Sequence, residues 1–116
     1  MTAPSSWRGY KRTNKYGAKR TQIGSETFDS KAEASRWTIL RLMQKAGEIS
    51  DLRRQVKFPI YVGDWLVTHY VADFVYHKNG RRVIEDVKSA PTITEVFKIK
   101  SVLFWLQYGQ EIEVAR

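Results

Sequence analysis

The sequence predicts an α/β architecture of the α+β sandwich type, in which helices flank one mixed sheet. Its 116 residues leave room for a single domain. Hydrophobic residues make up 42% of the chain, which is enough to form a packed core. Helical and strand patterns follow one another in the order helix, three antiparallel strands, helix, strand, and this order is typical of such a sandwich.

A short hairpin and a helix are expected first. Two short strand patterns, 19–23 and 26–28, flank Gly24 and Ser25, which suit a turn. Ser30 then precedes a helical pattern that continues to about Ala46 and ends at Gly47. The apolar residues expected to form the buried stripe of this helix are Ile39, Leu42, Met43 and Ala46.

Three strand patterns follow the first helix. The first of them contains Pro59, which predicts an edge strand or a bulge, and it ends at a Gly63-Asp64 turn. The second and third are joined by Asn79-Gly80, two residues that tolerate positive φ and favour a tight hairpin turn. The predicted strands cover 55–62, 65–77 and 82–88.

A second helix and a short strand complete the expected fold. Thr92 and Glu95 are spaced as a capping box, and the helical pattern that they open continues to about Gln107 and ends at Gly109. The residues 111–115 are expected to form the last strand. The predicted apolar stripe of the second helix consists of Val96, Ile99, Leu103 and Leu106.

The composition excludes several classes of protein. The absence of cysteine excludes a disulfide framework, a cysteine zinc site and a thiol nucleophile. No apolar run is long enough to span a membrane, and the start of the chain lacks a signal-peptide core, so we expect a cytoplasmic protein. Twenty Lys and Arg against twelve Asp and Glu give a net charge of +8, which favours a polyanionic partner.

The positive charge is concentrated at the start of the chain. Six cations and no acid precede Glu26, and residues 1–16 also contain the proline, serine and glycine of a flexible arm. We expect this arm to contact nucleic-acid phosphates and residues 17–116 to form the domain; the alternative is a solubilising tail. Two lysines of the second helix are further candidates, unless they belong to a solvated helix face. The candidate nucleic-acid-binding residues are Arg8, Lys11, Arg12, Lys15, Lys98 and Lys100.

The Asn79-Gly80 turn determines which residues of its two strands lie opposite each other. With those two residues as the loop, Asp73 lies directly opposite Asp86. The Cβ atoms of such a pair are about 5 Å apart, and like charges at that distance destabilise a hairpin. A divalent cation removes this conflict. Mg²⁺ suits the position because it prefers oxygen ligands and completes its shell with water and phosphate.

Lys88 follows Asp86 by two residues and therefore lies on the same face of the strand. A lysine there can orient the attacking water or offset the charge that develops on a phosphodiester in the transition state. Two acids and such a lysine are what metal-assisted hydrolysis of a phosphodiester requires. The alternatives are structural: Asp73 shares a proton with Asp86, or Lys88 only pairs with Asp86.

Glu33 has two interpretations. It lies three residues after Ser30, so it can complete a capping box by accepting a hydrogen bond from the Ser30 backbone N–H. It can also extend from the first turn of the helix toward the metal as a third carboxylate. The spacing alone favours neither interpretation.

Together these residues resemble a known signature. Glu33, Asp73 and the segment Asp86–Lys88 are similar to the Glu…Asp…(Asp/Glu)-x-Lys pattern of the PD-(D/E)XK nuclease superfamily, whose core has the same αβββαβ order. Over roughly residues 15–115, the chain resembles small phage proteins that are assigned to this superfamily and associated with junction-resolving or related endonucleases. Ala72 stands where the name of the superfamily has proline.

The resemblance implies a restriction-endonuclease-like fold and a metal-dependent endonuclease. Asp73, Asp86 and Glu33 become the metal ligands, and Lys88 becomes the catalytic lysine. The implied cofactor is Mg²⁺, for which Mn²⁺ can substitute.

The expected function is hydrolysis of DNA, including branched or junction DNA, in phage recombination, replication or packaging within the bacterial host cell. We also expect a homodimer, because breaking two strands needs two sites related by symmetry. The candidate contacts are Trp65, Trp105 or the arm. The alternatives are an inactive nucleic-acid-binding module of the same fold and an RNA-directed nuclease.

Overall fold

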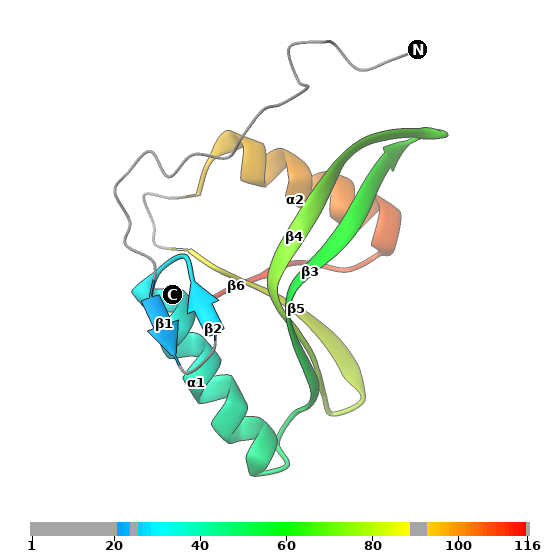
Figure 1. Cartoon of the computed structure of the whole chain (residues 1–116). Helices are drawn as coiled ribbons and strands as arrows, with labels where there is room; N and C mark the ends of the chain where they lie inside the picture. Colours follow the sequence, from blue (N-terminus) through cyan, green and yellow to red (C-terminus); the bar gives the residue numbers. More distant parts are fainter. Residues whose placement is uncertain (1–20, 24–25, 89–92, 116) are drawn as a thin grey trace.

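A mixed sheet of four strands organises the molecule (Figure 1). The computed structural model describes residues 21–23, 26–88 and 93–115. The elements are β1 (Thr21–Ile23), β2 (Glu26–Phe28), α1 (Lys31–Lys45), β3 (Ser50–Val62), β4 (Trp65–Lys78), β5 (Arg81–Val87), α2 (Glu95–Tyr108) and β6 (Glu113–Ala115). The sheet order is β3-β4-β5-β6, with β6 parallel to β5 and the other neighbours antiparallel, while β1 and β2 form a separate hairpin.

This arrangement confirms the predicted α+β fold and most of its turns. Strand β3 lies at an edge of the sheet, as Pro59 indicated. Asn79 and Gly80 both have positive φ, at 52° and 76°, as the predicted hairpin turn requires. Gly47 follows α1 with a φ of 81°, a backbone conformation that glycine adopts without a Cβ clash. None of the described helices is long and apolar enough to cross a membrane.

Two of the predicted features lie outside the described residues. These are the basic arm over 1–16, with its four candidate cations, and the turn residues 24 and 25 of the first hairpin. The paired strands of that hairpin are described, with Thr21 opposite Phe28.

Two predicted boundaries were wrong. Strand β3 begins at Ser50 and not at 55, because Ser50 and Arg53 already pair with β4 across a register shift. This stretch is mostly polar and so shows no strand pattern in the sequence. Its backbone is also irregular, because Asp51 has a positive φ of 55°. Helix α2 begins at Glu95 and is capped by Thr94, whose hydroxyl accepts a hydrogen bond from the Phe97 N–H. The cap is therefore not the predicted Thr92, which lies outside the described residues.

The predicted apolar stripe of α1 was also wrong, except for Met43, which packs against the core. The buried residues of α1 are Glu33, Ala34 and Leu40, and Trp37 and Met43 pack beside them. Ile39, Leu42 and Ala46 are exposed. Contacts with the sheet set this rotation of the helix. Trp37 stacks on Phe74 of β4 with ring centroids 6.0 Å apart, and the face that carries Trp37 therefore points inward.

The stripe predicted for α2 failed for a different reason. Most residues of this helix are apolar, so hydrophobic periodicity does not select one face. Aromatic packing selects it instead: Phe104 is fully buried and contacts Phe58 edge to face, with Phe97 and Tyr108 beside it. Val96, Ile99 and Leu106 are exposed, whereas Leu103 packs against the core.

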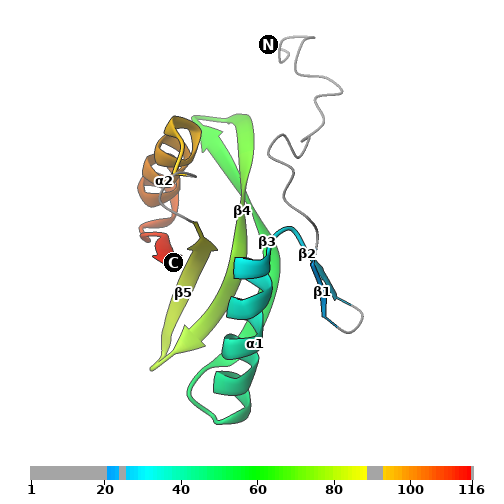
Figure 2. The same cartoon turned by 90° about the vertical axis from the view of Figure 1, so that its left-hand side faces the viewer.

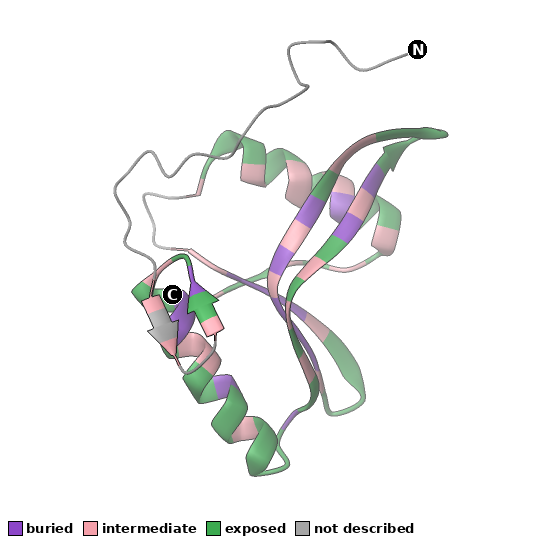
Figure 3. Ribbon diagram, viewed as in Figure 1, coloured by how far each residue is buried: buried purple, intermediate pink, exposed green. Residues whose placement is uncertain are grey.

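The two helices cover opposite faces of the sheet. Adjacent residues of a strand point to opposite faces, and Phe74 belongs to the cluster under α1 while Val75 belongs to the cluster under α2. Figure 2 shows α1 and α2 on either side of β5, and Figure 3 shows buried positions along the middle of β4 and β5.

Besides its register shifts at Ser50/Arg53 and Ile60/Tyr61, the ladder between β3 and β4 lacks one pair in its middle. Arg54 pairs with Phe74 and Val56 pairs with Ala72, but the described ladder contains no pair between Gln55 and Asp73. Gln55 has a φ of 54°, a left-handed conformation that does not suit a regular strand. The interruption coincides with a change of face along β4, because Ala72 packs in the α2 cluster and Phe74 in the α1 cluster.

Glu85 lies on the α1 face and is held there by an ion pair. Arg36 of α1 donates two hydrogen bonds to its carboxylate, at 2.9 and 2.8 Å, and the Tyr76 hydroxyl donates a third at 3.2 Å. The Glu85 side chain is therefore fully partnered, and it points away from Asp73 and Asp86.

In a regular strand, an alanine variant is more stable than a glycine variant, and we expect the left-handed backbone of Gln55 to reverse that order. We predict that Gln55→Gly is more stable than Gln55→Ala by about 1 kcal/mol, because both variants lose the amide but only alanine retains a Cβ that disfavours positive φ. Urea unfolding with equal m-values measures the difference.

A matched pair at a regular position is the control. At Lys57, an exposed residue of β3 that pairs with Val71, alanine should exceed glycine in stability. The same order at both positions would contradict the conformation assigned to Gln55.

Candidate active site

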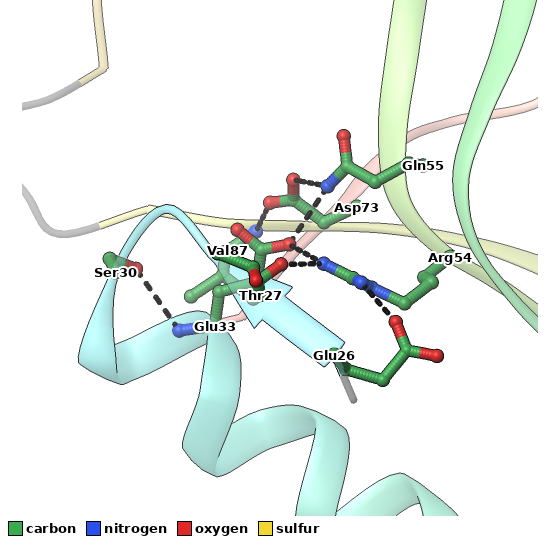
Figure 4. A network of polar contacts seen from close by, with 8 residues as sticks. All are labelled: Glu26, Thr27, Ser30, Glu33, Arg54, Gln55, Asp73 and Val87. Atoms are coloured by element: carbon green, nitrogen blue, oxygen red, sulfur yellow. Dashed lines mark hydrogen bonds and ion pairs between the residues drawn. The ribbon is translucent and has the colours of Figure 1, made fainter. Parts of the chain in front are cut away.

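The sequence-predicted acids and lysine come together around one cavity of about 320 Å³. It lies where the start of α1, the middle of β3 and β4 and the end of β5 meet (Figure 4). Its lining residues are Asp29, Ser30, Ala32, Glu33, Gln55, Val71, Asp73, Asp86, Val87 and Lys88. All four residues predicted to be catalytic therefore face the same space.

Asp73 and Asp86 lie beside each other as the hairpin register predicted. The ladder from the turn runs to the pair Phe74–Glu85, and the next position in that register is Asp73 with Asp86. At this position the Asp73 side chain bonds the backbone of β5: its Oδ2 accepts a hydrogen bond of 2.9 Å from the Val87 N–H. The two carboxylates are thus held by the backbone of both strands.

Asp86 is almost completely buried, with 4% of its surface exposed. Its Oδ2 accepts a hydrogen bond of 3.1 Å from the Tyr70 hydroxyl, and its Oδ1 lies 3.9 Å from Lys88 Nζ. Burial, and then the hydrogen bond and negative charge of Asp73, raise the pKa of Asp86 to about 8, although Lys88 and Tyr70 act in the opposite direction. The pair is therefore poised to share a proton or to accept a cation.

Glu33 takes part in the helix cap through its backbone, whereas its side chain makes other contacts. Its backbone N–H donates to the Ser30 hydroxyl at 3.1 Å, which caps α1. Its carboxylate points into the cavity, where Oε1 accepts a hydrogen bond of 2.8 Å from Gln55 Nε2 and lies 3.7 Å from the Arg54 guanidinium. Burial and then the charge of Asp73 raise the pKa of Glu33 to about 7. The cap uses the backbone of Glu33 and leaves its side chain for the site.

Gln55 is the site residue that sequence reasoning missed. Its Nε2 donates to Glu33 Oε1 and to Asp73 Oδ1, at 2.8 and 3.3 Å, and so links the helix carboxylate to the strand carboxylate (Figure 4). The residue type carried no signal, because a polar residue on an edge strand commonly faces solvent. At this position the backbone of Gln55 has a left-handed φ, and no pattern in the sequence indicates that conformation.

Arg54 ties the β1–β2 hairpin to the cavity. Its guanidinium pairs with Glu26 at 2.6 Å, donates to the Thr27 carbonyl at 2.9 Å and lies 4.0 Å above the Phe28 ring. Because Arg54 also lies 3.7 Å from Glu33, these contacts hold the hairpin next to Glu33.

The arrangement fits a divalent cation at Asp73 and Asp86. Among the described residues, no three acidic, histidine or cysteine side chains converge as a complete metal-binding group. Two adjacent carboxylates are nevertheless the usual protein contribution to a Mg²⁺ site, which keeps several waters and takes substrate oxygens. Glu33 is connected to this pair through Gln55, so the structure places it beside the pair and not within it.

The other predicted residues are distributed around this site. Lys98 is exposed and pairs with Glu95 at 3.1 Å. Lys100 is half-buried, and its Nζ donates to the His69 carbonyl at 3.1 Å. His77 lies 3.6 Å from Asp51 and does not line the cavity.

Comparison with known proteins assigns a family. The model of a family described as a protein of unknown function, DUF1064, matches residues 13–115, which is most of the chain. The chain belongs to the DUF1064 family. No curated protein and no solved structure matches it.

The DUF1064 match contains every residue around the cavity, from Asp29 to Lys88, as well as both helices. Membership of DUF1064 does not assign an activity, because the family is described as one of unknown function. The resemblance to PD-(D/E)XK nucleases, and the restriction-endonuclease-like fold that it implies, therefore stay predictions.

The raised pKa of Asp86 makes the stability of the metal-free protein depend on pH. Between about 4, where an unfolded aspartate ionises, and about 8, the folded protein retains a proton that the unfolded chain has released. The free energy of unfolding therefore falls as pH rises through this window, and Glu33 acts in the same direction. We predict that Asp86→Asn removes part of this slope, so that its stability relative to wild type grows from pH 5 to pH 8.

Urea unfolding in EDTA at several pH values measures the effect. Glu95→Gln, at an exposed carboxylate of α2 outside the cavity lining, is the control and should keep the wild-type slope. A stability difference between Asp86→Asn and wild type that does not change with pH would contradict the assignment.

Proposed function

We propose that this protein is a Mg²⁺-dependent endonuclease that hydrolyses DNA phosphodiester bonds. One observation carries the proposal: Asp73 and Asp86 lie side by side at a cavity, with Asp86 buried and with Lys88 Nζ 3.9 Å from its carboxylate. Burying two like charges together gains nothing for the fold. Such a pair is useful where a divalent cation and a phosphate bind, and a lysine beside it completes the set that phosphodiester hydrolysis requires.

The roles of the residues follow from their positions. Asp73 and Asp86 would hold the ion. Bound there, Mg²⁺ or Mn²⁺ would neutralise the two carboxylates, polarise the scissile phosphate and lower the pKa of a coordinated water. Gln55 fixes Asp73 relative to Glu33, and Glu33 supplies a third carboxylate, with a pKa of about 7, for an outer coordination contact or for proton transfer.

Lys88 is placed to act on the phosphate. Its side chain lines the cavity, pairs with Asp86 and lies over the Phe97 ring, with 5.1 Å between Nζ and the ring centroid. These contacts hold the ammonium at the edge of the cavity. There it can orient the attacking water and offset the charge that accumulates on the phosphate oxygens in the transition state.

The net charge of +8 supports a nucleic-acid substrate. Six cations precede the first acid of the chain, which suits contact with the phosphates of DNA. If the protein is phage-encoded, as the sequence resemblance suggests, the substrate is branched or replicating DNA in the cytoplasm of the host cell.

Substitutions at the cavity test the proposal. We predict that Asp73→Asn and Asp86→Asn each reduce Mg²⁺-dependent DNA cleavage by at least 100-fold, because the ion loses a ligand, while stability stays equal or rises by about 0–1 kcal/mol. Lys88→Ala should lose cleavage but retain Mn²⁺ binding. Glu33→Gln keeps the backbone cap on Ser30, so a loss of cleavage there assigns a chemical role to the carboxylate.

The assay uses linear, nicked, flapped and four-way DNA with Mg²⁺ and with Mn²⁺, together with matched RNA. Asp51→Asn, at an exposed acid outside the cavity, is the control and should cut as wild type does. Binding of DNA without cleavage by wild type would favour the inactive binding module, and cleavage confined to RNA would favour the RNA-directed nuclease. Cleavage by Asp86→Asn at the wild-type rate would falsify the assigned site.

We propose further that two copies associate through α2. Five of its large apolar side chains are more than half exposed, namely Val96, Ile99, Val102, Trp105 and Leu106. A helix that is apolar on its inner and its outer face is normally covered on both. Glu95 and Lys98 on the same helix pair with each other at 3.1 Å, so two such faces can meet without net repulsion despite the basic charge of the chain.

A charge on this face should separate the copies. We predict that wild type is a dimer and that Leu106→Glu is a monomer, because the glutamate would have to be buried in the interface. Light scattering across a range of concentrations, with and without DNA, measures the mass. Leu42→Glu is the matched control, because Leu42 is similarly exposed, at 62% against 66%, but lies on α1. A monomeric wild type under all conditions, or equal effects of both variants, would contradict an interface on α2.

A further inference from the structure

A second cavity adjoins the candidate active site on the α2 side of Lys88. Its volume is about 310 Å³, and it shares Val71, Asp86 and Lys88 with the first cavity. The remaining lining residues come from β4 and α2 and are His69, Tyr70, Thr94, Val96, Phe97 and Lys100. Asp86 and Lys88 therefore separate two connected spaces.

The two cavities differ in charge. The first extends from Asp86 toward Glu33 and Asp29, so its far rim is acidic. The second extends from Asp86 toward Lys100 and His69, and Asp86 is the acid among its lining residues. A polyanion that enters this region is repelled on one side and attracted on the other.

Lys100 is held at the second cavity by the fold. Its Nζ donates a hydrogen bond of 3.1 Å to the carbonyl oxygen of His69, which joins α2 to β4. On the facing side, Lys88 Nζ lies over the Phe97 ring. The two ammonium groups therefore border the same space, with the apolar surface of Phe97 between α2 and the sheet.

We propose that this second cavity binds the DNA phosphate next to the one that is cut. The inference rests on the proposed nuclease function. A nucleic-acid strand carries one negative charge per nucleotide, so a strand whose scissile phosphate lies at Asp73 and Asp86 must place its next phosphate beside the site. The acidic rim of the first cavity repels that phosphate, whereas Lys100 of the second cavity attracts it. The strand then runs from the first cavity across Lys88 toward α2.

The structure also separates two lysines that the sequence presented as equivalent. Lys98 and Lys100 lie two residues apart on α2. Lys98 pairs with Glu95 on the exposed surface, with 59% of its side chain exposed, and it does not line the second cavity. Lys100 does. A general attraction of DNA to a basic helix involves both lysines, whereas a phosphate subsite involves Lys100.

The test measures DNA binding in the absence of divalent metal, so that it does not depend on cleavage. Lys100→Gln removes the charge and keeps an N–H donor for the His69 carbonyl, Lys100→Arg keeps the charge, and Lys98→Gln is the matched control. We expect Lys100→Gln to weaken binding three- to tenfold and to flatten the plot of log Kobs against log [salt] by about 0.9 for duplex DNA. Lys100→Arg should restore both values, and Lys98→Gln should change neither.

A second arm locates the phosphate. Where wild type cuts at a defined position, DNA with a single uncharged methylphosphonate beside that position should bind wild type more weakly, and Lys100→Gln should not distinguish it from unmodified DNA. Equal effects of Lys98→Gln and Lys100→Gln, an unchanged salt slope, or a methylphosphonate penalty that persists in Lys100→Gln overturns the inference. Cleavage by wild type is scored separately. Cleavage with no effect at Lys100 refutes only the subsite, and a Lys100 effect without any cleavage refutes only the nuclease.

Discussion

The candidate site depends on one irregularity in the backbone, the interruption of the β3–β4 ladder at Gln55 and Asp73. In a regular strand, Ala72 and Phe74 would point to the same face of β4. With Gln55 at a φ of 54°, its amide instead reaches Glu33 and Asp73, and Ala72 and Phe74 pack under different helices. Non-glycine residues in this conformation carry strain, which proteins retain mainly where it serves a function.

The electrostatics of β5 show the same division between fold and site. Glu85 and Asp86 are consecutive, and both are almost completely buried, but alternation places them on opposite faces. Glu85 is neutralised by a bidentate contact with Arg36. Asp86 faces another carboxylate, and its lysine neighbour is 3.9 Å away and also borders two cavities. One acid therefore stabilises the packing of α1, whereas the other remains available for a cation.

Features that local rules determine could be predicted from the sequence, whereas features that packing determines could not. The Asn79-Gly80 turn has few allowed conformations, and its register placed Asp73 beside Asp86 by counting alone. The role of Gln55 depends on a backbone conformation that only the assembled fold imposes. The outward position of Leu106 was equally hidden, because α2 is apolar almost all round and aromatic packing decides its rotation. For Glu33, the spacing allowed its carboxylate either to cap the helix or to face the site; the cap uses the Glu33 backbone N–H, and the carboxylate bonds Gln55 at the cavity.

An unfavourable site persists only if its surroundings hold it in place. The strained Gln55 and the two adjacent carboxylates lie between two aromatic groups. On the α2 side, Phe58, Tyr70, Phe104 and Tyr108 pack with ring centroids 4.7–6.4 Å apart; on the α1 side, Trp37 contacts Phe28 and Phe74 at 6.1 and 6.0 Å. Such contacts are rigid and contribute beyond the burial of area. The Tyr70 hydroxyl also bonds Asp86, so the α2 group orients a carboxylate as well as packing the core. Because stiff groups fix both faces, the polar residues between them cannot relax apart, as the proposed cation site requires.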